Sequence, residues 1–242
     1  MILPYFMPNN YFEFKQFIIC QDRCAFKVGT DGVLLGASAS VEGRKRILDI
    51  GTGSGLIAIM MAQKCEAGII AIEPDRESFQ QACENVKNCK WNDRIRVIET
   101  DLQHFSEENN TFDLIVTNPP FFSNSLTNPD PRKSKARHNT LLSTEDLLEG
   151  VNRLMSDDGC FQLIMPYVEG NIFIAEASGY GLYCNSVLKI RPLPTSEIRR
   201  IILTFSRHHF PPKEKFLTIE HGRRYDFTEE YKELTRDFYL KF

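Results

Sequence analysis

Short apolar runs alternate with helical patterns along the chain from residue 46 onward. Runs rich in β-branched residues occupy 47–50, 68–73, 94–99 and 112–117. Two helical stretches lie among them, an apolar one at 56–63 and a polar one at 75–87. Strands that are apolar throughout and joined through helices favour a parallel sheet covered on both faces. The pattern therefore predicts an α/β fold, doubly wound around a mostly parallel sheet.

The second half of the chain predicts one more helix and three more strands. Apolar residues share one helical face in 143–155, and Thr144 can cap the start of that helix. We expect strands at 160–165, 181–190 and 198–205. In the last of these, Ile201, Leu203 and Phe205 stand at alternate positions, which favours an antiparallel edge strand. The whole pattern predicts a seven-stranded sheet whose last strand is antiparallel.

The first 40 residues differ in character from the rest. Residues 11–19 alternate like a hairpin arm, and 30–40 predict a short helix. The chain shows no internal repeat and no low-complexity tract. We expect a single domain over 1–242, with 1–40 as an N-terminal extension packed on the main sheet and 41–242 as the core.

Composition narrows the class of protein. The 242 residues are 42% apolar, and 29 basic against 32 acidic residues leave a net charge of −3, so an anionic partner must meet a local basic patch. The seven cysteines form no C-x-x-C pair and predict reduced thiols in a cytoplasmic protein, with no structural metal site. The apolar runs are too short for a membrane helix, and the proline-containing N-terminus predicts neither a signal peptide nor an anchor.

A glycine-rich turn is the sharpest local motif. Asp49 precedes Gly51, Gly53 and Gly55, and the turn joins a strand to a helix. Glycines let the backbone turn tightly and approach a ligand. A dinucleotide motif would need glycine at position 56, where this chain has leucine. We therefore favour S-adenosyl-L-methionine as cofactor, with a dinucleotide or a merely structural turn as the alternatives.

Two acidic residues stand at or just after the ends of the next two predicted strands, 68–73 and 94–99. Glu73 stands 20 residues after Gly53, where a carboxylate can accept hydrogen bonds from both ribose hydroxyls of an adenosine. Asp101 follows the strand at 94–99 and can accept from the adenine amino group. Either residue could instead cap a helix.

The motif Asn118-Pro119-Pro120-Phe121 follows the strand at 112–117. The prolines hold the backbone, so the Asn118 amide oxygen and the Pro119 carbonyl can accept both hydrogens of a planar NH2 group. Phe121 offers a face on which a flat base or amide can stack. The amine of adenine is a weak nucleophile, so orientation would supply most of the catalysis. A rigid loop without function is the alternative.

Together, the glycine turn and the Asn-Pro-Pro-Phe motif resemble class I S-adenosylmethionine-dependent amino-methyltransferases, which act on exocyclic amines of bases or on glutamine amides. More narrowly, residues 14–37, 136–138 and 234–242 resemble the tRNA(valine) adenine-N(6)-methyltransferases, which modify the adenosine following the anticodon. The resemblance implies a Rossmann-like fold and transfer of a methyl group to the N(6) amine of a tRNA adenosine next to the anticodon.

The resemblance also implies roles for matched residues. Gly51, Gly53 and Gly55 would wrap the methionine end of the cofactor, Glu73 would bind its ribose and Asp101 its adenine. The residues implied to hold the acceptor amine are Asn118, Pro119, Pro120 and Phe121, with Phe121 where tyrosine is frequent in the family. Those of the N-terminal signature, which lies over the cofactor in such enzymes, are Lys27, Thr30 and Asp31; Thr30 or Asp31 could instead cap the helix that follows.

A basic run follows the Asn-Pro-Pro-Phe motif and could meet the phosphates of the tRNA anticodon stem-loop. Its charged residues are Arg132, Lys133, Lys135 and Arg137. A solvated loop is the alternative. His138 could contact RNA or cap a helix, and the residue pattern assigns no role to Cys20 or Cys24.

Rival functions remain at this point. A glutamine-amide methyltransferase acting on a protein, or a guanine exocyclic-amine methyltransferase acting on rRNA, can use the same motif. An NAD-dependent oxidoreductase would explain Glu73 but would leave Asn118 without a role. A non-catalytic RNA-binding module would retain the cofactor turn without using it.

Overall fold

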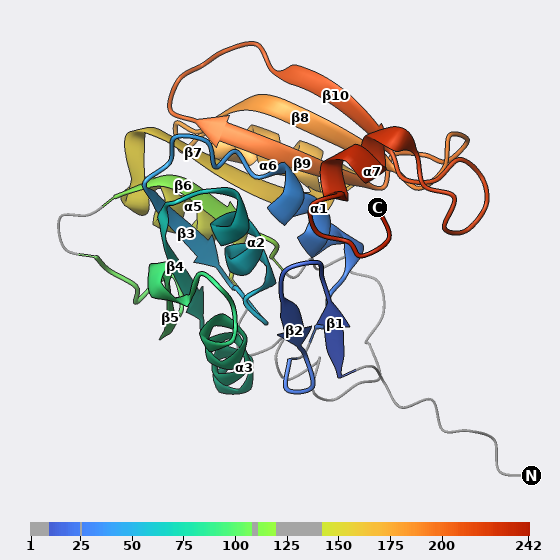
Figure 1. Cartoon of the computed structure of the whole chain (residues 1–242). Helices are drawn as coiled ribbons and strands as arrows, with labels where there is room; N and C mark the ends of the chain where they lie inside the picture. Colours follow the sequence, from blue (N-terminus) through green and yellow to red (C-terminus); the bar gives the residue numbers. More distant parts are fainter. Residues whose placement is uncertain (1–9, 25, 108–110, 120–141) are drawn as a thin grey trace, which may run out of the picture.

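The computed structural model describes residues 10–24, 26–107, 111–119 and 142–242. Its centre is an eight-stranded sheet with the strand order β10-β8-β9-β7-β6-β3-β4-β5 (Figure 1). In chain order, the first four strands of this sheet are β3 (Arg46–Ile50), β4 (Gly68–Glu73), β5 (Ile95–Glu99) and β6 (Phe112–Thr117). The others are β7 (Met155–Pro166), β8 (Tyr183–Arg191), β9 (Arg200–Ser206) and β10 (Lys213–Thr218).

Helices cover both faces of the sheet, because its strands are apolar on both faces. One face packs against α1 (Thr30–Ser38), α2 (Leu56–Lys64), α3 (Arg76–Lys87) and α7 (Glu229–Thr235). The other packs against α5 (Thr144–Leu154) and α6 (Tyr167–Ser178). A short 3-10 helix, η1 (Asn92–Arg94), precedes β5. The predicted doubly wound α/β fold is confirmed.

The sheet has eight strands where seven were predicted, and its C-terminal strands are ordered differently from the expectation. Strand β9 is antiparallel to both of its neighbours, as expected, but it lies between β7 and β8 and is therefore not an edge strand. Ile201, Ile202 and Leu203 are all buried, since helices cover both faces here. Strand β10 is an eighth strand that pairs in parallel with β8. Its sequence Lys-Glu-Lys-Phe-Leu-Thr is mostly exposed, so apolar periodicity could not reveal it.

The N-terminal residues form a hairpin beside the main sheet. The expected single arm contains two short strands, β1 (Tyr11–Glu13) and β2 (Ile18–Cys20), which pair antiparallel with each other. Phe14, Phe17 and Ile19 are buried in the same apolar cluster as α1 and α2. Helix α1 lies close against α2, and a Cβ atom on Gly36 would come within 2.8 Å of Met60 Sδ.

Local signals explain the helix ends and what was missed. Ser143, not Thr144, caps α5: its side chain accepts from the Asp146 N–H, and the Asp146 carboxylate accepts from the Ser143 N–H in return. The pattern also failed to predict α6, which buries only three of its 12 residues, and α7, which has only seven residues. No helix in the described ranges is long and apolar enough to span a membrane.

Candidate active site

The carboxyl ends of β3, β4, β5 and β6 meet at one edge of the sheet, because the four strands run parallel. The described residues there form a cavity of about 660 Å³, within the range of small-molecule sites. It brings together nine residues singled out from the sequence: Lys27, Thr30, Asp31, Gly51, Gly53, Glu73, Asp101, Asn118 and Pro119. Asp49 and Gly55 do not line it. Pro120, Phe121, His138 and the predicted basic run lie outside the described residues.

The glycine turn has the backbone that its sequence predicts. Gly51, Gly53 and Gly55 have φ angles of +68°, +58° and +82°, in the left-handed region that side chains disfavour. The Gly51 and Thr52 N–H groups donate to the Ile72 carbonyl at 2.9 and 3.0 Å. A Cβ atom on Gly51 or Gly53 would meet nothing within 4 Å, so the turn leaves open space where a ligand can approach.

Asp49 lies behind the turn. Its side chain is completely buried, and its carboxylate accepts from the Thr52 hydroxyl at 2.6 Å. Burial raises the pKa of Asp49 to about 7, and the hydrogen bond from Thr52 offsets only part of this effect. Asp49 therefore supports the turn from within the core, and direct contact with a cofactor stays a prediction.

Glu73 faces the cavity from the end of β4. Its carboxylate accepts from the Gly53 N–H at 2.8 Å and from the Asp75 N–H at 3.0 Å. Burial raises the pKa of Glu73, although both hydrogen bonds oppose the shift. One side chain thus holds the glycine turn against the start of α3 and presents an acidic group to the cavity.

Asp101 faces the cavity just beyond β5. The N–H of His104 donates to Asp101 Oδ1 at 2.8 Å, and His104 Nδ1 lies 2.7 Å from the same oxygen. Burial acts to raise the pKa of Asp101, but the contacts with His104 outweigh it and lower the pKa. Asp101 therefore caps a turn, where the alternative predicted a helix, and it also lines the cavity.

Asn118 and Pro119 enter the cavity from the end of β6. The Thr117 hydroxyl donates to the Ile50 carbonyl at 2.9 Å, which fixes this strand end beside the glycine turn. The first turn of α1 lies opposite: a Cβ atom on Gly32 would come 3.9 Å from Asn118 Nδ2. The amide is thus enclosed between β6 and α1.

Thr30 and Asp31 do not cap α1. The N-cap is Gly29, which makes no side-chain capping bond. Instead, the Asp31 carboxylate accepts from Arg200 Nε at 2.8 Å and ties α1 to the start of β9. Lys27, the other residue of the N-terminal signature, also lines the cavity.

The cavity includes residues that sequence patterns missed. Cys24, Phe26, Ser78 and Leu102 all line it. The pKa of Cys24 is raised to about 12, chiefly by burial and also by Glu73, so its thiol stays protonated. A single cysteine carries no local signal of this placement. No group of three or more His, Cys, Asp or Glu side chains in the described part of the chain is arranged to hold a metal ion.

The sequence of the chain is similar to those of known methyltransferases. A family model described as a methyltransferase small domain matches residues 28–159. A tRNA1(Val) (adenine(37)-N6)-methyltransferase of Bacteroides fragilis is 45% identical over 237 residues, covering 97% of this chain and 100% of the relative. A protein of the same name in Trichodesmium erythraeum is 43% identical over 240 residues, covering 98% and 100%. The chain belongs to this methyltransferase family.

Structural similarity agrees with this family. A predicted O-methyltransferase of Agrobacterium tumefaciens, protein Atu636, superposes with a TM-score of 0.66 at 21% identity, covering 86% of this chain and 96% of that one. This likeness shows a shared fold; the family model and the relatives confirm the methyltransferase assignment, with S-adenosyl-L-methionine as methyl donor. The cavity fits this donor, since it combines an open glycine turn with carboxylates at two neighbouring strand ends.

The buried carboxyl of Asp49 predicts a pH dependence of stability. Its folded pKa of about 7 exceeds the ordinary aspartate value of 3.8, so the folded methyltransferase binds an extra proton between these pH values. The stabilisation of the folded state is complete below about pH 4, is lost progressively as the pH rises from 4 to 7, and is absent above this range. Between about pH 5 and pH 8, we expect the cofactor-free protein to lose about 3 kcal/mol more unfolding free energy than Asp49→Asn.

Urea denaturation across this pH range measures the difference. The asparagine variant keeps an oxygen that can accept from the Thr52 hydroxyl, so it removes the titration with little change of shape. Parallel pH profiles for the two proteins would contradict the prediction.

Proposed function

We propose that this chain transfers a methyl group from S-adenosyl-L-methionine to the N(6) amine of an adenosine next to the anticodon of tRNA(Val). The observation that carries the proposal is that Asn118 and Pro119 line the same cavity as the glycine turn and Glu73. An amine held by the first pair would therefore face a donor held by the second. The relatives in Bacteroides fragilis and Trichodesmium erythraeum, both named as tRNA1(Val) adenine methyltransferases, support this choice of substrate.

The donor would bind along the strand ends. We assign its methionine end to the glycine turn, its ribose to the Glu73 carboxylate and its adenine to Asp101. Gly55 and Asp49 would act indirectly, because Gly55 begins α2 and Asp49 holds Thr52. When bound, S-adenosyl-L-methionine supplies an electrophilic methyl group on a positively charged sulfur.

The acceptor amine would be oriented by hydrogen bonds. Asn118 Oδ1 and the Pro119 carbonyl would each accept one N–H, which turns the nitrogen lone pair toward the methyl group. No strong base is needed, because the amine becomes cationic and acidic once the methyl group is attached. Phe121 would stack on the base, which must leave its neighbours to reach the cavity.

The domain organisation and location follow from the same proposal. Cys24 and residues 26–32 line the cavity, which supports a single domain in which 1–40 extends over the cofactor site and 41–242 forms the catalytic core. A tRNA substrate and seven free cysteines favour the cytoplasm.

Incubation with isotopically labelled S-adenosyl-L-methionine tests the substrate class. We expect label in tRNA and none in total protein or rRNA, and nucleoside mass spectrometry should identify N6-methyladenosine. tRNA from cells that lack the enzyme is the appropriate acceptor, since its target position is unmodified. Label in a protein glutamine or in guanosine of rRNA would instead establish one of the two rival activities.

Asn118→Ala removes one of the two proposed acceptors for the amine. We expect kcat on tRNA to fall by about 10²- to 10³-fold, the usual effect of deleting one such oriented group. The dissociation constant for S-adenosylhomocysteine, measured by calorimetry, should change little. Asn92→Ala, which alters a surface asparagine in η1, is the control. An Asn118→Ala enzyme with normal kcat would exclude the proposed clamp.

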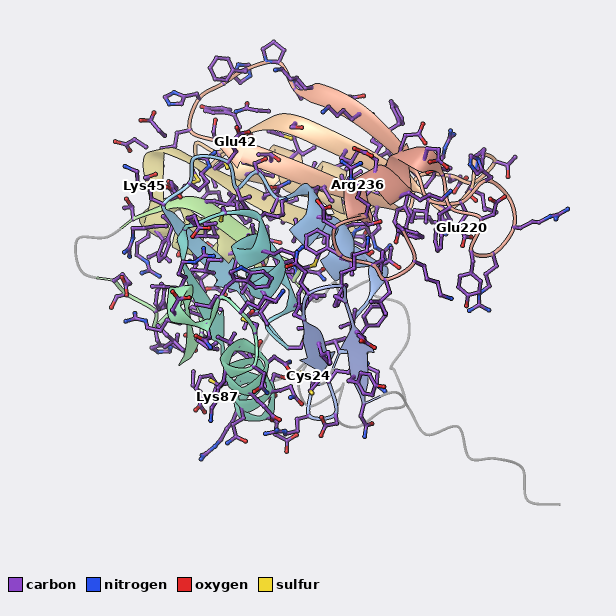
Figure 2. The ribbon with its side chains drawn as sticks, viewed as in Figure 1. Cys24, Glu42, Lys45, Lys87, Glu220 and Arg236 are labelled. Atoms are coloured by element: carbon purple, nitrogen blue, oxygen red, sulfur yellow. The ribbon has the colours of Figure 1, made fainter. Side chains whose placement is uncertain are left out.

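The basic run would bind phosphates of the anticodon stem-loop. Replacing Arg132, Lys133, Lys135 and Arg137 with alanine should weaken tRNA binding and reduce the slope of log affinity against log salt by about 3 to 4. As a matched control, Lys45→Ala and Lys87→Ala remove exposed charges at the start of β3 and the end of α3 (Figure 2). An unchanged salt slope in the first variant would show that this run does not meet the RNA.

A further inference from the structure

One wall of the cavity comes from outside the main sheet. Cys24 and residues 26–32 line the cavity, and they follow the small hairpin rather than a strand of the large sheet (Figures 1 and 2). The glycine turn forms another wall of the same cavity. Because the two walls belong to separate parts of the chain, their separation depends on whatever connects them.

Asn85 of α3 makes that connection. The Cys20 N–H donates to Asn85 Oδ1 at 2.9 Å, and Asn85 Nδ2 donates back to the Cys20 carbonyl at 2.8 Å. The same Nδ2 donates to the Ser54 carbonyl in the glycine turn, also at 2.8 Å. The residue is only 1% exposed, so water cannot replace these bonds readily.

Further polar contacts keep the hairpin end in place. The Arg23 N–H donates to Gln81 Oε1 at 3.3 Å, and Arg23 pairs with Glu84, so two more residues of α3 hold this segment. The Val28 N–H donates to Gln21 Oε1 at 2.8 Å and closes the segment into a compact loop. Among these contacts, the amide of Asn85 is the one that also reaches the glycine turn.

We infer that Asn85 is a positioning residue that sets the separation between the N-terminal wall and the glycine turn, and thereby the affinity for the cofactor. It does not line the cavity, so it acts through Cys20 and Ser54. The effect on cofactor affinity rests on the proposed use of this cavity for S-adenosyl-L-methionine; the effect on the wall itself does not.

Two variants test this role. Asn85→Ala removes all three hydrogen bonds, and Asn85→Asp keeps the shape but places a carboxylate oxygen against two carbonyls. We expect the dissociation constant for S-adenosylhomocysteine to rise by about 10- to 100-fold in both, as unpaired buried groups let the walls separate. At saturating cofactor, kcat should stay within about threefold of wild type, because orientation of the amine is unaffected.

Gln162→Ala is the matched control. Gln162 is also buried, at 3% exposed, and its amide binds two backbone groups, the Ser38 carbonyl and the Ser40 N–H, at the C-terminal end of α1. It does not line the cavity. We expect it to lower the melting temperature by a similar amount while cofactor affinity stays within about twofold. If the Asn85 and Gln162 variants lose stability alike and all retain normal cofactor affinity, Asn85 is only structural.

Tryptic cleavage provides a readout that needs no cofactor. Release of the N-terminal wall should speed cleavage after Arg23 and Lys27 by about tenfold or more in Asn85→Ala, and leave it unchanged in Gln162→Ala. Should wild-type protein fail to bind S-adenosylhomocysteine, the proposed function is wrong, but these cleavage rates still decide the positioning role. Equal rates in wild type and Asn85→Ala would overturn it.

Discussion

The cavity depends on the buried carboxylate of Glu73. It accepts from the Gly53 N–H and the Asp75 N–H, and so joins the turn after β3 to the start of α3 at adjacent strand ends. Such a bond can form only if the turn brings its N–H groups toward β4, which requires left-handed backbone at Gly51 and Gly53. The glycines and the carboxylate therefore form one unit: the first provides the shape and the second holds it.

The same carboxylate gives the cavity its electrostatic character. Glu73 and Asp49 are both buried and both have raised pKa values, mainly through loss of hydration. A ligand that carries positive charge would restore part of the lost stabilisation, whereas the pyrophosphate of a dinucleotide would add repulsion. This contrast gives a physical reason why an acidic residue before a glycine turn favours a sulfonium donor, in agreement with the methyltransferase family of the chain.

Helix α3 connects the parts of the molecule that enclose the donor. It begins three residues beyond Glu73, packs beside the glycine turn at Gly55, and holds the hairpin end through Asn85 and Gln81. Asp31 plays a similar part at the other side, since its pair with Arg200 fastens α1 to β9. Together with the bonds of Gln162 to Ser38 and Ser40, these contacts anchor the N-terminal extension to the core.

The sequence by itself determined the parallel α/β core and most of the polar residues that meet at its edge. Glu73, Asp101 and Asn118 each lie at or just beyond the end of a strand, and parallel strands place their carboxyl ends together. The tertiary structure was needed to show that Asp49 lies behind the turn, that β9 is interior and flanked by β8, and that Cys24 and residues 26–32 form a wall held by Asn85. Local periodicity indicates which residues favour burial, but it does not indicate their partners, because these are set by packing between distant segments. Asn85 and Cys20, for example, are hydrogen-bonded across 65 positions of the chain.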